Sequence, residues 1–198
     1  MPNTPNKIKF GLSNCYYAIA TIDSSTGEAT YATPVAIPGA VNLSLEAQGE
    51  NSPFYADNIV YYVSSSNQGY QGDLEIAVVP EKFKKEILGY MTDAKDVLFE
   101  NAEAEAVHFA FLFQFEGDLR ATRHVLYNCT VTRPTQAGAT KTDTVEPQTE
   151  TLTLTATTIK NAVCNKNVTK AESAADTDST VYNGWFSAVY QGTAAATT

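Results

Sequence analysis

The sequence is poor in the residues that carry most metal-binding and redox chemistry. Its 198 residues include three cysteines and two histidines. Cys15, Cys129 and Cys164 are widely spaced and form no CxxC pair, so they match neither a zinc site nor a disulfide framework. Such a sparse, odd number is typical of free thiols in a reducing cytoplasm, with one buried pair left open. The sequence therefore predicts no metal and no cofactor.

Arrangements for catalysis are missing as well. His108 opens an apolar stretch, and His124 lies between Arg123 and Val125, with no carboxylate close in sequence. His124 and Cys129 are five residues apart, and on a strand that spacing points their side chains to opposite faces. The sequence contains no glycine-rich phosphate loop and no GxSxG motif. We therefore expect no catalytic residue and no enzyme.

Positive charge is absent from a long stretch of the chain. Between residues 10 and 80 there is no lysine or arginine, and the formal net charge of the whole sequence is −9. This balance argues against nucleic-acid binding and against attachment to an anionic membrane. The longest apolar run, near 109–113, is too short to span a membrane, and MPNTPNKIKF has no signal region. We expect synthesis in the cytoplasm and no membrane partner.

What the sequence does contain is alternation of apolar and polar residues, which is typical of strands. The clearest case is 41–48, where one face is apolar and the other carries Asn42, Ser44, Glu46 and Gln48. Similar patterns at 7–22, 54–63, 74–78, 108–115, 120–133 and 149–158 predict further strands. Strands at this spacing, separated by turn signals, indicate a mainly β protein with a β-sandwich or barrel-like fold.

One short helix is predicted at about residues 80–89, packed on the sheet. Pro80 suits a first helical turn, and Glu81 lies near the positive end of the helix dipole. Phe83 and Ile87 are four residues apart and form a narrow apolar face. Gly89 can end the helix.

The pattern also divides the chain. Residues 1–160 are expected to form the main domain, with 1–7 as an N-terminal arm and 134–148 as a long polar loop. A loop of that length is seldom idle in a compact domain, so we expect it to order against another molecule; a mobile hairpin tip is the alternative. Residues 161–180 read as a linker or mobile segment. Residues 181–198 are expected to form a C-terminal strand, with Trp185 available to anchor it in the core, and a polar tail.

Adjacent aromatic residues recur along the predicted strands. The pairs are Tyr16-Tyr17, Phe54-Tyr55 and Tyr61-Tyr62. Neighbouring side chains on a strand point to opposite faces, so one member of each pair should be in the core. The other could stack on a sugar or on a neighbouring subunit.

Several segments together resemble a known family. They are KIKFGLSNCYYA, TPVAIPGAVNLSLEAQGE, PFYADNIVYY, GYQGDLEIAVVPEKFKKEILG, ATRHVLYNCTVTRP and EPQTETLTLTAT, and they cover most of residues 7–160. In these the chain resembles the major tail (tail tube) protein of long non-contractile-tailed bacteriophages, the phi13-type family. The resemblance implies a tail tube fold and a structural virion protein that assembles with itself into hexameric rings stacked as a hollow tube. It also implies a tape measure protein and tail initiator and terminator proteins as partners, with DNA passing through unbound.

Under this resemblance, two sets of residues become candidate sites. The polar strand face would line the lumen, where its negative charge repels phosphates: Asn42, Ser44, Glu46, Gln48 and Glu75. The long loop would make contacts between rings, together with the N-terminal arm and 164–180: Thr135, Gln136, Lys141, Asp143 and Glu146. Two alternatives remain at this point: a β-sandwich module that binds carbohydrate or a partner through its aromatics, and the inner tube of a related secretion apparatus.

Overall fold

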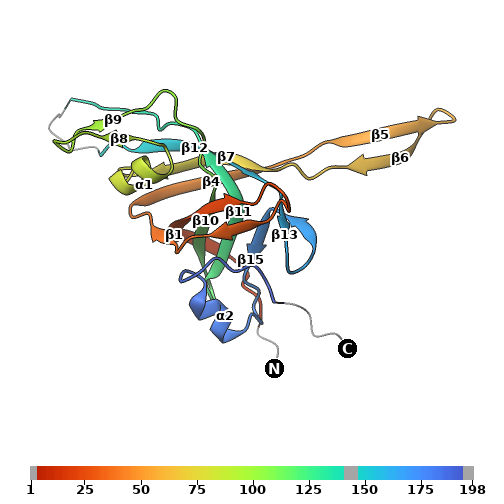
Figure 1. The fold of residues 1–198 in the computed structure, drawn as a ribbon. Coiled ribbons are helices and arrows are strands. Elements are labelled where there is room, and N and C mark those ends of the chain that lie inside the picture. The colour runs from red at the N-terminus through yellow and green to blue at the C-terminus, as the bar shows by residue number, and fades with distance from the viewer. Residues whose placement is uncertain (1–3, 141–146, 194–198) are drawn as a thin grey trace.

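The computed structural model describes residues 4–140 and 147–193. These ranges contain one large antiparallel sheet, three two-stranded ribbons and two short helices (Figure 1). The fold is mainly β, as the sequence predicts. Neither described helix is long or apolar enough to cross a membrane.

The large sheet has the strand order β2-β1-β10-β11-β12-β7-β4, with β3 also paired to β1 and β15 to β11. Its strands are β1 (Lys9–Ile22), β2 (Ala29–Tyr31), β3 (Val35–Ala36), β4 (Ala40–Gln48), β7 (Gly69–Ile76), β10 (Phe109–Gly117), β11 (Thr122–Val131), β12 (Glu150–Thr157) and β15 (Lys170–Glu172). β10 and β11, which correspond to the strands predicted at 108–115 and 120–133, form a hairpin, and β12 returns beside β11 after the long loop.

Alternation along β10 places apolar side chains on both faces of the sheet. Phe109, Phe111 and Phe113 are buried in one cluster, and Ala110 and Leu112 in a second cluster on the other side. The first cluster also holds side chains from β1 and β4, which stand far apart in the strand order. The sheet therefore curls around this first cluster, and the second cluster lies outside the curl.

Helix α1 (Glu81–Glu86) packs on the first cluster through Phe83. The Phe83 ring meets Tyr17 edge-on at 5.0 Å and Phe109 at 5.8 Å between ring centroids. The Tyr17 hydroxyl donates to a carboxylate oxygen of Glu86 at 2.7 Å. The helix is shorter than the predicted 80–89, and Gly89, with φ +69°, turns the chain away after it.

The C-terminal region differs most from the prediction. A helix, α2 (Ser179–Gly184), stands where the C-terminal strand was predicted to begin, at the start of 181–198. The Asp178 carboxylate caps it by accepting from the backbone N–H groups of Thr180 and Val181. Val181, Trp185 and Val189 recur every four residues and pack on the second cluster, so the segment follows a helical rather than a two-residue period. Trp185 is the core anchor that the sequence suggested, but on a helical turn.

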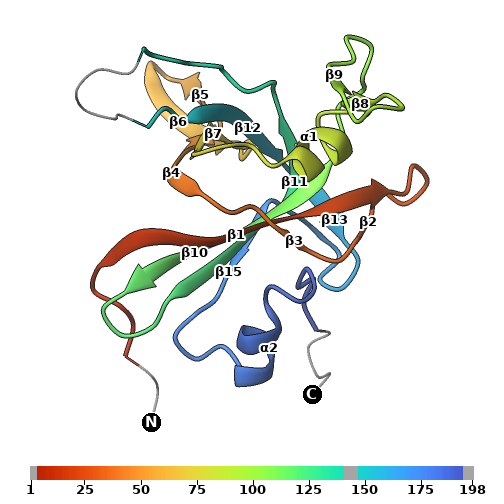
Figure 2. The ribbon, with the colours of Figure 1, turned by 90° about the vertical axis from the view of Figure 1, so that its left-hand side faces the viewer.

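The segment predicted as a linker or mobile, 161–180, is paired instead. β13 (Ile159–Asn161) forms a ribbon with β14 (Lys166–Val168), and β15 adds to β11. Figure 2 shows α1 and α2 on opposite sides of β1 and β10. The C-terminal region thus covers the outer face of β1, β10 and β11.

Two ribbons project from the sheet. β4 and β7 extend beyond it as β5 (Asn51–Ala56) and β6 (Ile59–Ser65), which form a long arm (Figure 1). The prediction of one strand at 54–63 is corrected here, because the chain turns back at Asp57-Asn58. Both residues have positive φ, 50° and 60°, which makes a two-residue hairpin turn rather than an irregularity. The second ribbon, β8 (Met91–Thr92) with β9 (Leu98–Phe99), projects at the other end of the molecule.

Candidate functional site: polar sheet face and apolar ends

The predicted polar face of β4 extends across two further strands. Register places Asn42 opposite Glu75, Ser44 opposite Asp73, and Glu46 opposite Gln71. On the other side of β7 the next residues in these rows are threonines. The three rows are Asn42–Glu75–Thr151, Ser44–Asp73–Thr153 and Glu46–Gln71–Thr155. None of these side chains is basic.

The polar rows lie outside the curl because the residues between them point inward. Leu74, Leu152 and Leu154 are fully buried in the first cluster. The alternation in DLEI and LTLT therefore separates a dry face from a wet one. Hydrogen bonds link neighbouring strands on the wet face. The Thr153 hydroxyl donates to Asp73 at 2.9 Å.

This wet face continues the face that α2 covers farther along the sheet. Thr130 of β11 pairs with Thr155, on the side opposite the first cluster. Over β4 and β7, Ser44, Glu46 and Asp73 are exposed, whereas over β10 the same side is buried beneath Trp185. An open hollow lies on the wet face over β4, β7 and β12, and it is lined by Ser44, Glu46, Gln48, Gln71, Gly72, Asp73 and Thr153. The sheet thus presents one uncovered, acidic patch.

The structure brings together the residues predicted for this face. Asn42, Ser44, Glu46 and Glu75 lie in the rows, and Gln48 lines the hollow at the end of β4. Sequence reasoning missed the partners on β7 and β12: Gln71, Asp73, Thr151, Thr153 and Thr155. Their period of two was visible in the sequence, but the register that aligns them is a tertiary property.

The predicted loop residues are only partly described. Thr135 makes an antiparallel bridge to Thr151, with its backbone N–H 3.0 Å from the Thr151 oxygen, and Gln136 is exposed. Lys141, Asp143 and Glu146 lie outside the described residues. An ion pair between Arg133 and Glu100 joins the start of this loop to the segment after β9.

The arm carries its apolar side chains in the open. Tyr61 and Tyr62 are 71% and 64% exposed, and Phe54 and Tyr55 are exposed to a similar degree. The expectation that one member of each aromatic pair is in the core is therefore wrong for both pairs on the arm. It fails because the arm extends past the sheet and has no core beneath either face. For Tyr16-Tyr17 it is correct, since Tyr17 is buried.

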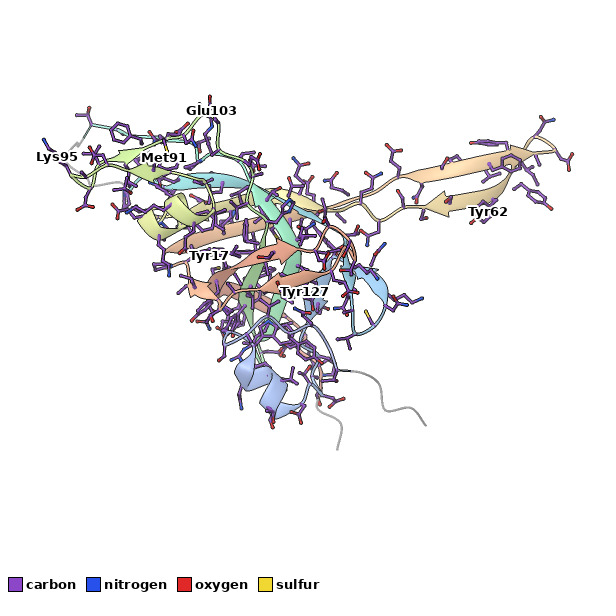
Figure 3. The ribbon with its side chains drawn as sticks, viewed as in Figure 1. Tyr17, Tyr62, Met91, Lys95, Glu103 and Tyr127 are labelled. Atoms are coloured by element: carbon purple, nitrogen blue, oxygen red, sulfur yellow. The ribbon has the colours of Figure 1, made fainter. Side chains whose placement is uncertain are left out.

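The β8–β9 ribbon is the apolar counterpart at the other end. Met91 pairs with Phe99 across the two strands, and about half of each side chain is exposed, as is that of Val97. Figure 3 places Tyr62 of the arm and Met91 of this ribbon at opposite ends of the molecule.

His124, Cys15 and Cys129 are buried, and burial is the main cause of their shifted pKa values. Burial lowers the pKa of His124 to about 4, and its ring stacks on Phe113 at 4.9 Å between centroids. Burial raises the pKa of the Cys15 thiol to about 12, so this sulfur stays protonated and unreactive. Cys129 is fully buried and its pKa is raised too. All three cysteines are free thiols. The described residues contain no group of side chains arranged to hold a metal ion.

Taken together, these features define a mainly β protein, whose prominent surfaces are an acidic sheet face and two projecting apolar ends. The family model described as phage tail tube protein matches residues 4–187. The chain therefore belongs to the phage tail tube protein family. It is a structural component of a phage tail and not an enzyme.

A chain in the cryo-electron microscopy structure of the anti-feeding prophage baseplate, symmetrised sixfold, is 12% identical. The match covers 87% of this chain and 98% of that chain, with a TM-score of 0.44. No curated protein matches the sequence.

Proposed function

We propose that this chain is the tail tube subunit of a phage with a long, non-contractile tail, a siphovirus, and is related to the phi13-type major tail proteins. Copies assemble into hexameric rings, and the rings stack into a hollow conduit through which DNA is ejected. The subunit is made in the cytoplasm of the host and ends in the virion tail. The uncovered acidic face of β4, β7 and β12 is the observation that carries this proposal.

That face suits the wall of a DNA channel. Glu46, Asp73 and Glu75 are its charged side chains, and no cation lies in the rows to bind phosphates. Repulsion acts over about 10 Å at ordinary salt, so a wall of carboxylates keeps DNA from adhering to it. The threonines and amides in the same rows keep the wall wet without attracting charge. Lumen-facing positions are thus assigned to Asn42, Ser44, Glu46, Gln48 and Glu75, with Asp73 added.

The edges of the sheet favour closure into a ring. β4 ends the strand order and pairs on one side only within the described residues, and β2 ends the other side. An unpaired edge is a template for another strand, and pairing between neighbouring copies would continue the sheet around the lumen. A head-to-tail contact of this kind closes when its rotation divides a full turn.

Stacking of rings requires a second, open-ended contact. The 1–7 arm, the 134–148 loop and 164–180 remain candidates for it, including Lys141, Asp143 and Glu146 beyond the described residues. Tail initiator and terminator proteins would begin and end growth, and a tape measure protein would occupy the lumen and set its length.

Self-assembly can be tested by measuring particle size at increasing protein concentration, with light scattering and negative-stain electron microscopy. We expect rings or hollow tubes that grow with concentration. A strict monomer at every concentration, also in the presence of the tail initiator, would refute the proposal and favour a binding module with exposed tyrosines.

Charge reversal tests the lumen. Glu46→Lys should leave tubes intact but slow DNA ejection from particles, because a ring of lysines binds the passing phosphates. The control is Glu105→Lys, which makes the same change in an exposed loop outside the sheet. Equal DNA ejection rates for the two variants would refute the proposed position of Glu46 in the lumen.

A further inference from the structure

The curl of the large sheet stays open on one side. β4 ends the strand order and pairs with β7, whereas β1 carries β3 as a partner at Tyr16 and Tyr17. The backbone N–H of Ile37 donates to the carbonyl of Cys15 at 2.7 Å, and beyond this bond β1 and β4 run apart, to the left of β3 in Figure 2. Within the described residues no ladder joins the two strands. Side chains of the first cluster are therefore accessible between them.

A half-open hollow of about 180 Å³ lies in this opening. Its apolar lining comes from three strands, and every member belongs to the first cluster or packs against it: Leu43, Leu45, Tyr70, Phe113 and Phe115. An apolar cavity of about 150 Å³ is large enough to hold benzene. The hollow therefore has room for one ring-sized apolar group.

The polar residues of the hollow are Lys9, His124 and Lys170. The Lys9 ammonium group lies 4.9 Å from the centroid of the Phe115 ring, and the Lys170 ammonium group lies 5.4 Å from that of Tyr70. The His124 ring is neutral at pH 7, because burial lowers its pKa to about 4, and it adds an aromatic wall. Two cations thus stand over the rings that line the hollow.

The charges around the hollow do not cancel. Those that act on His124 belong to Glu172, Lys170 and Lys9. Lys170 pairs with Glu172 at 3.2 Å, whereas Lys9 makes no ion pair within the described residues. One positive charge is left over, on a chain whose net charge is −9. An ammonium group beside an apolar lining favours a ligand that carries one anionic group next to an apolar one.

We propose that this hollow is a binding site for a small organic acid with a ring-sized apolar body and one carboxylate. The body fills the space beside Phe113 and Phe115, and the carboxylate accepts hydrogen bonds from the Lys9 ammonium group. The site lies within a single subunit. The inference therefore goes beyond the proposed tail tube function and does not depend on it.

Phenylacetate is a probe of this size and charge. It should be titrated at pH 7 into protein kept at concentrations where it is monomeric. We expect a saturable shift of the His124 ring resonances in NMR spectra, with a Kd on the order of 1 mM for so small a ligand. The resonances of His108, which contacts Asn128 and does not line the hollow, should not shift. Absence of a saturable shift at His124 would overturn the proposal.

Two analogues test the recognition of charge. Phenylacetamide keeps the ring but carries no charge, and phenethylamine carries a positive charge instead. Each should bind about tenfold more weakly than phenylacetate or not at all, because the hydrogen bond between carboxylate and ammonium group is lost. Equal affinities for phenylacetate and phenylacetamide would refute the role assigned to the Lys9 ammonium group.

Variants of the protein locate the site. Lys9→Met keeps an apolar stem but removes the charge, and it should weaken phenylacetate binding about tenfold. Lys166→Met makes the same change at an exposed residue of β14 that does not line the hollow, and its affinity should stay within about twofold of the wild type. Leu45→Phe keeps both cations but fills the hollow, and it should abolish binding.

The melting temperatures of these variants show whether they are folded. Wild-type affinity in folded Lys9→Met or Leu45→Phe would place the probe elsewhere and overturn the proposal. Tube assembly is measured separately by light scattering and electron microscopy, so a failure of the binding site leaves the proposed function standing, and the reverse also holds.

Discussion

Acidification is expected to destabilise this protein through His124. The ring lies against Phe113, stacked at 4.9 Å, and Phe115, at 5.5 Å between centroids. Its Nδ1 atom is buried and forms no hydrogen bond with any of the described residues. Burial lowers the pKa of His124 to about 4; the Glu172 carboxylate, 3.4 Å from Nδ1, opposes this, and the Lys170 and Lys9 ammonium groups add to it.

The sign follows from the two pKa values. In the unfolded chain the pKa of histidine is about 6.5, so below that pH the unfolded state binds a proton that the folded state refuses. The contribution of His124 to the free energy of unfolding is therefore fully present above about pH 6.5 and is lost as the pH drops toward 4. For a folded pKa of about 4, lowering the pH from 7.5 to 5 should cost about 2 kcal/mol in the free energy of unfolding.

Urea denaturation at pH 7.5 and 5.0 measures this loss, at concentrations where the protein is monomeric. His124→Phe keeps an aromatic ring against Phe113 but cannot titrate, so its loss should be smaller by about 2 kcal/mol. The carboxyl groups titrate in both proteins and cancel in the comparison. The same pH dependence in wild type and variant would refute the reasoning.

Three further predictions concern packing and thiol access. Gly72→Ala should lower the free energy of unfolding by about 3 kcal/mol in urea denaturation, because the added Cβ would lie 1.8 Å from the Ser44 backbone oxygen and force β4 away from β7. The control is Gly138→Ala, whose Cβ would meet open space, and its free energy of unfolding should stay within about 0.5 kcal/mol of the wild type. A Gly72→Ala variant as stable as the wild type would show that the strands can separate freely. Trp185→Ala should lose about 3–5 kcal/mol by calorimetry, since this buried side chain holds the C-terminal region on the sheet; a loss below 1 kcal/mol would contradict that role. A thiol reagent should label Cys164 alone in the folded protein and all three cysteines in denaturant, and rapid labelling of a second thiol before unfolding would disprove their burial.

Much of the fold could be predicted because its strands follow local rules. The alternation at 149–158 assigned the inward and outward residues of β12 correctly. The alternation at 41–48 did so for Leu43 and Leu45, whereas Val41 and Ala47 at the two ends of β4 are exposed. The helix after Pro80 was found from Phe83 and Ile87, which both belong to the first cluster. These patterns are properties of single segments, so no knowledge of the rest of the chain was needed to read them.

The same local rules misled where two periods compete. Residues 181–190 are rich in aromatic and β-branched side chains, which favour a strand, yet the segment forms α2 and a following turn. The segment is helical because Val181 and Trp185, four residues apart, pack together on the outer face of the sheet. The arm shows the converse. Its residues 54–63 read as a strand with one aromatic of each adjacent pair in the core, because composition does not reveal whether a core lies beneath.

The sequence by itself determined which side chains share one face of each strand, since a strand alternates whatever its neighbours are. It also determined that the stretch from 10 to 80 carries only negative charge. Only the tertiary structure decided that Asn42, Glu75 and Thr151 stand in one row, because register joins residues that are far apart in the chain. The same long-range pairing left the acidic face uncovered and placed the arm and the β8–β9 ribbon at opposite ends.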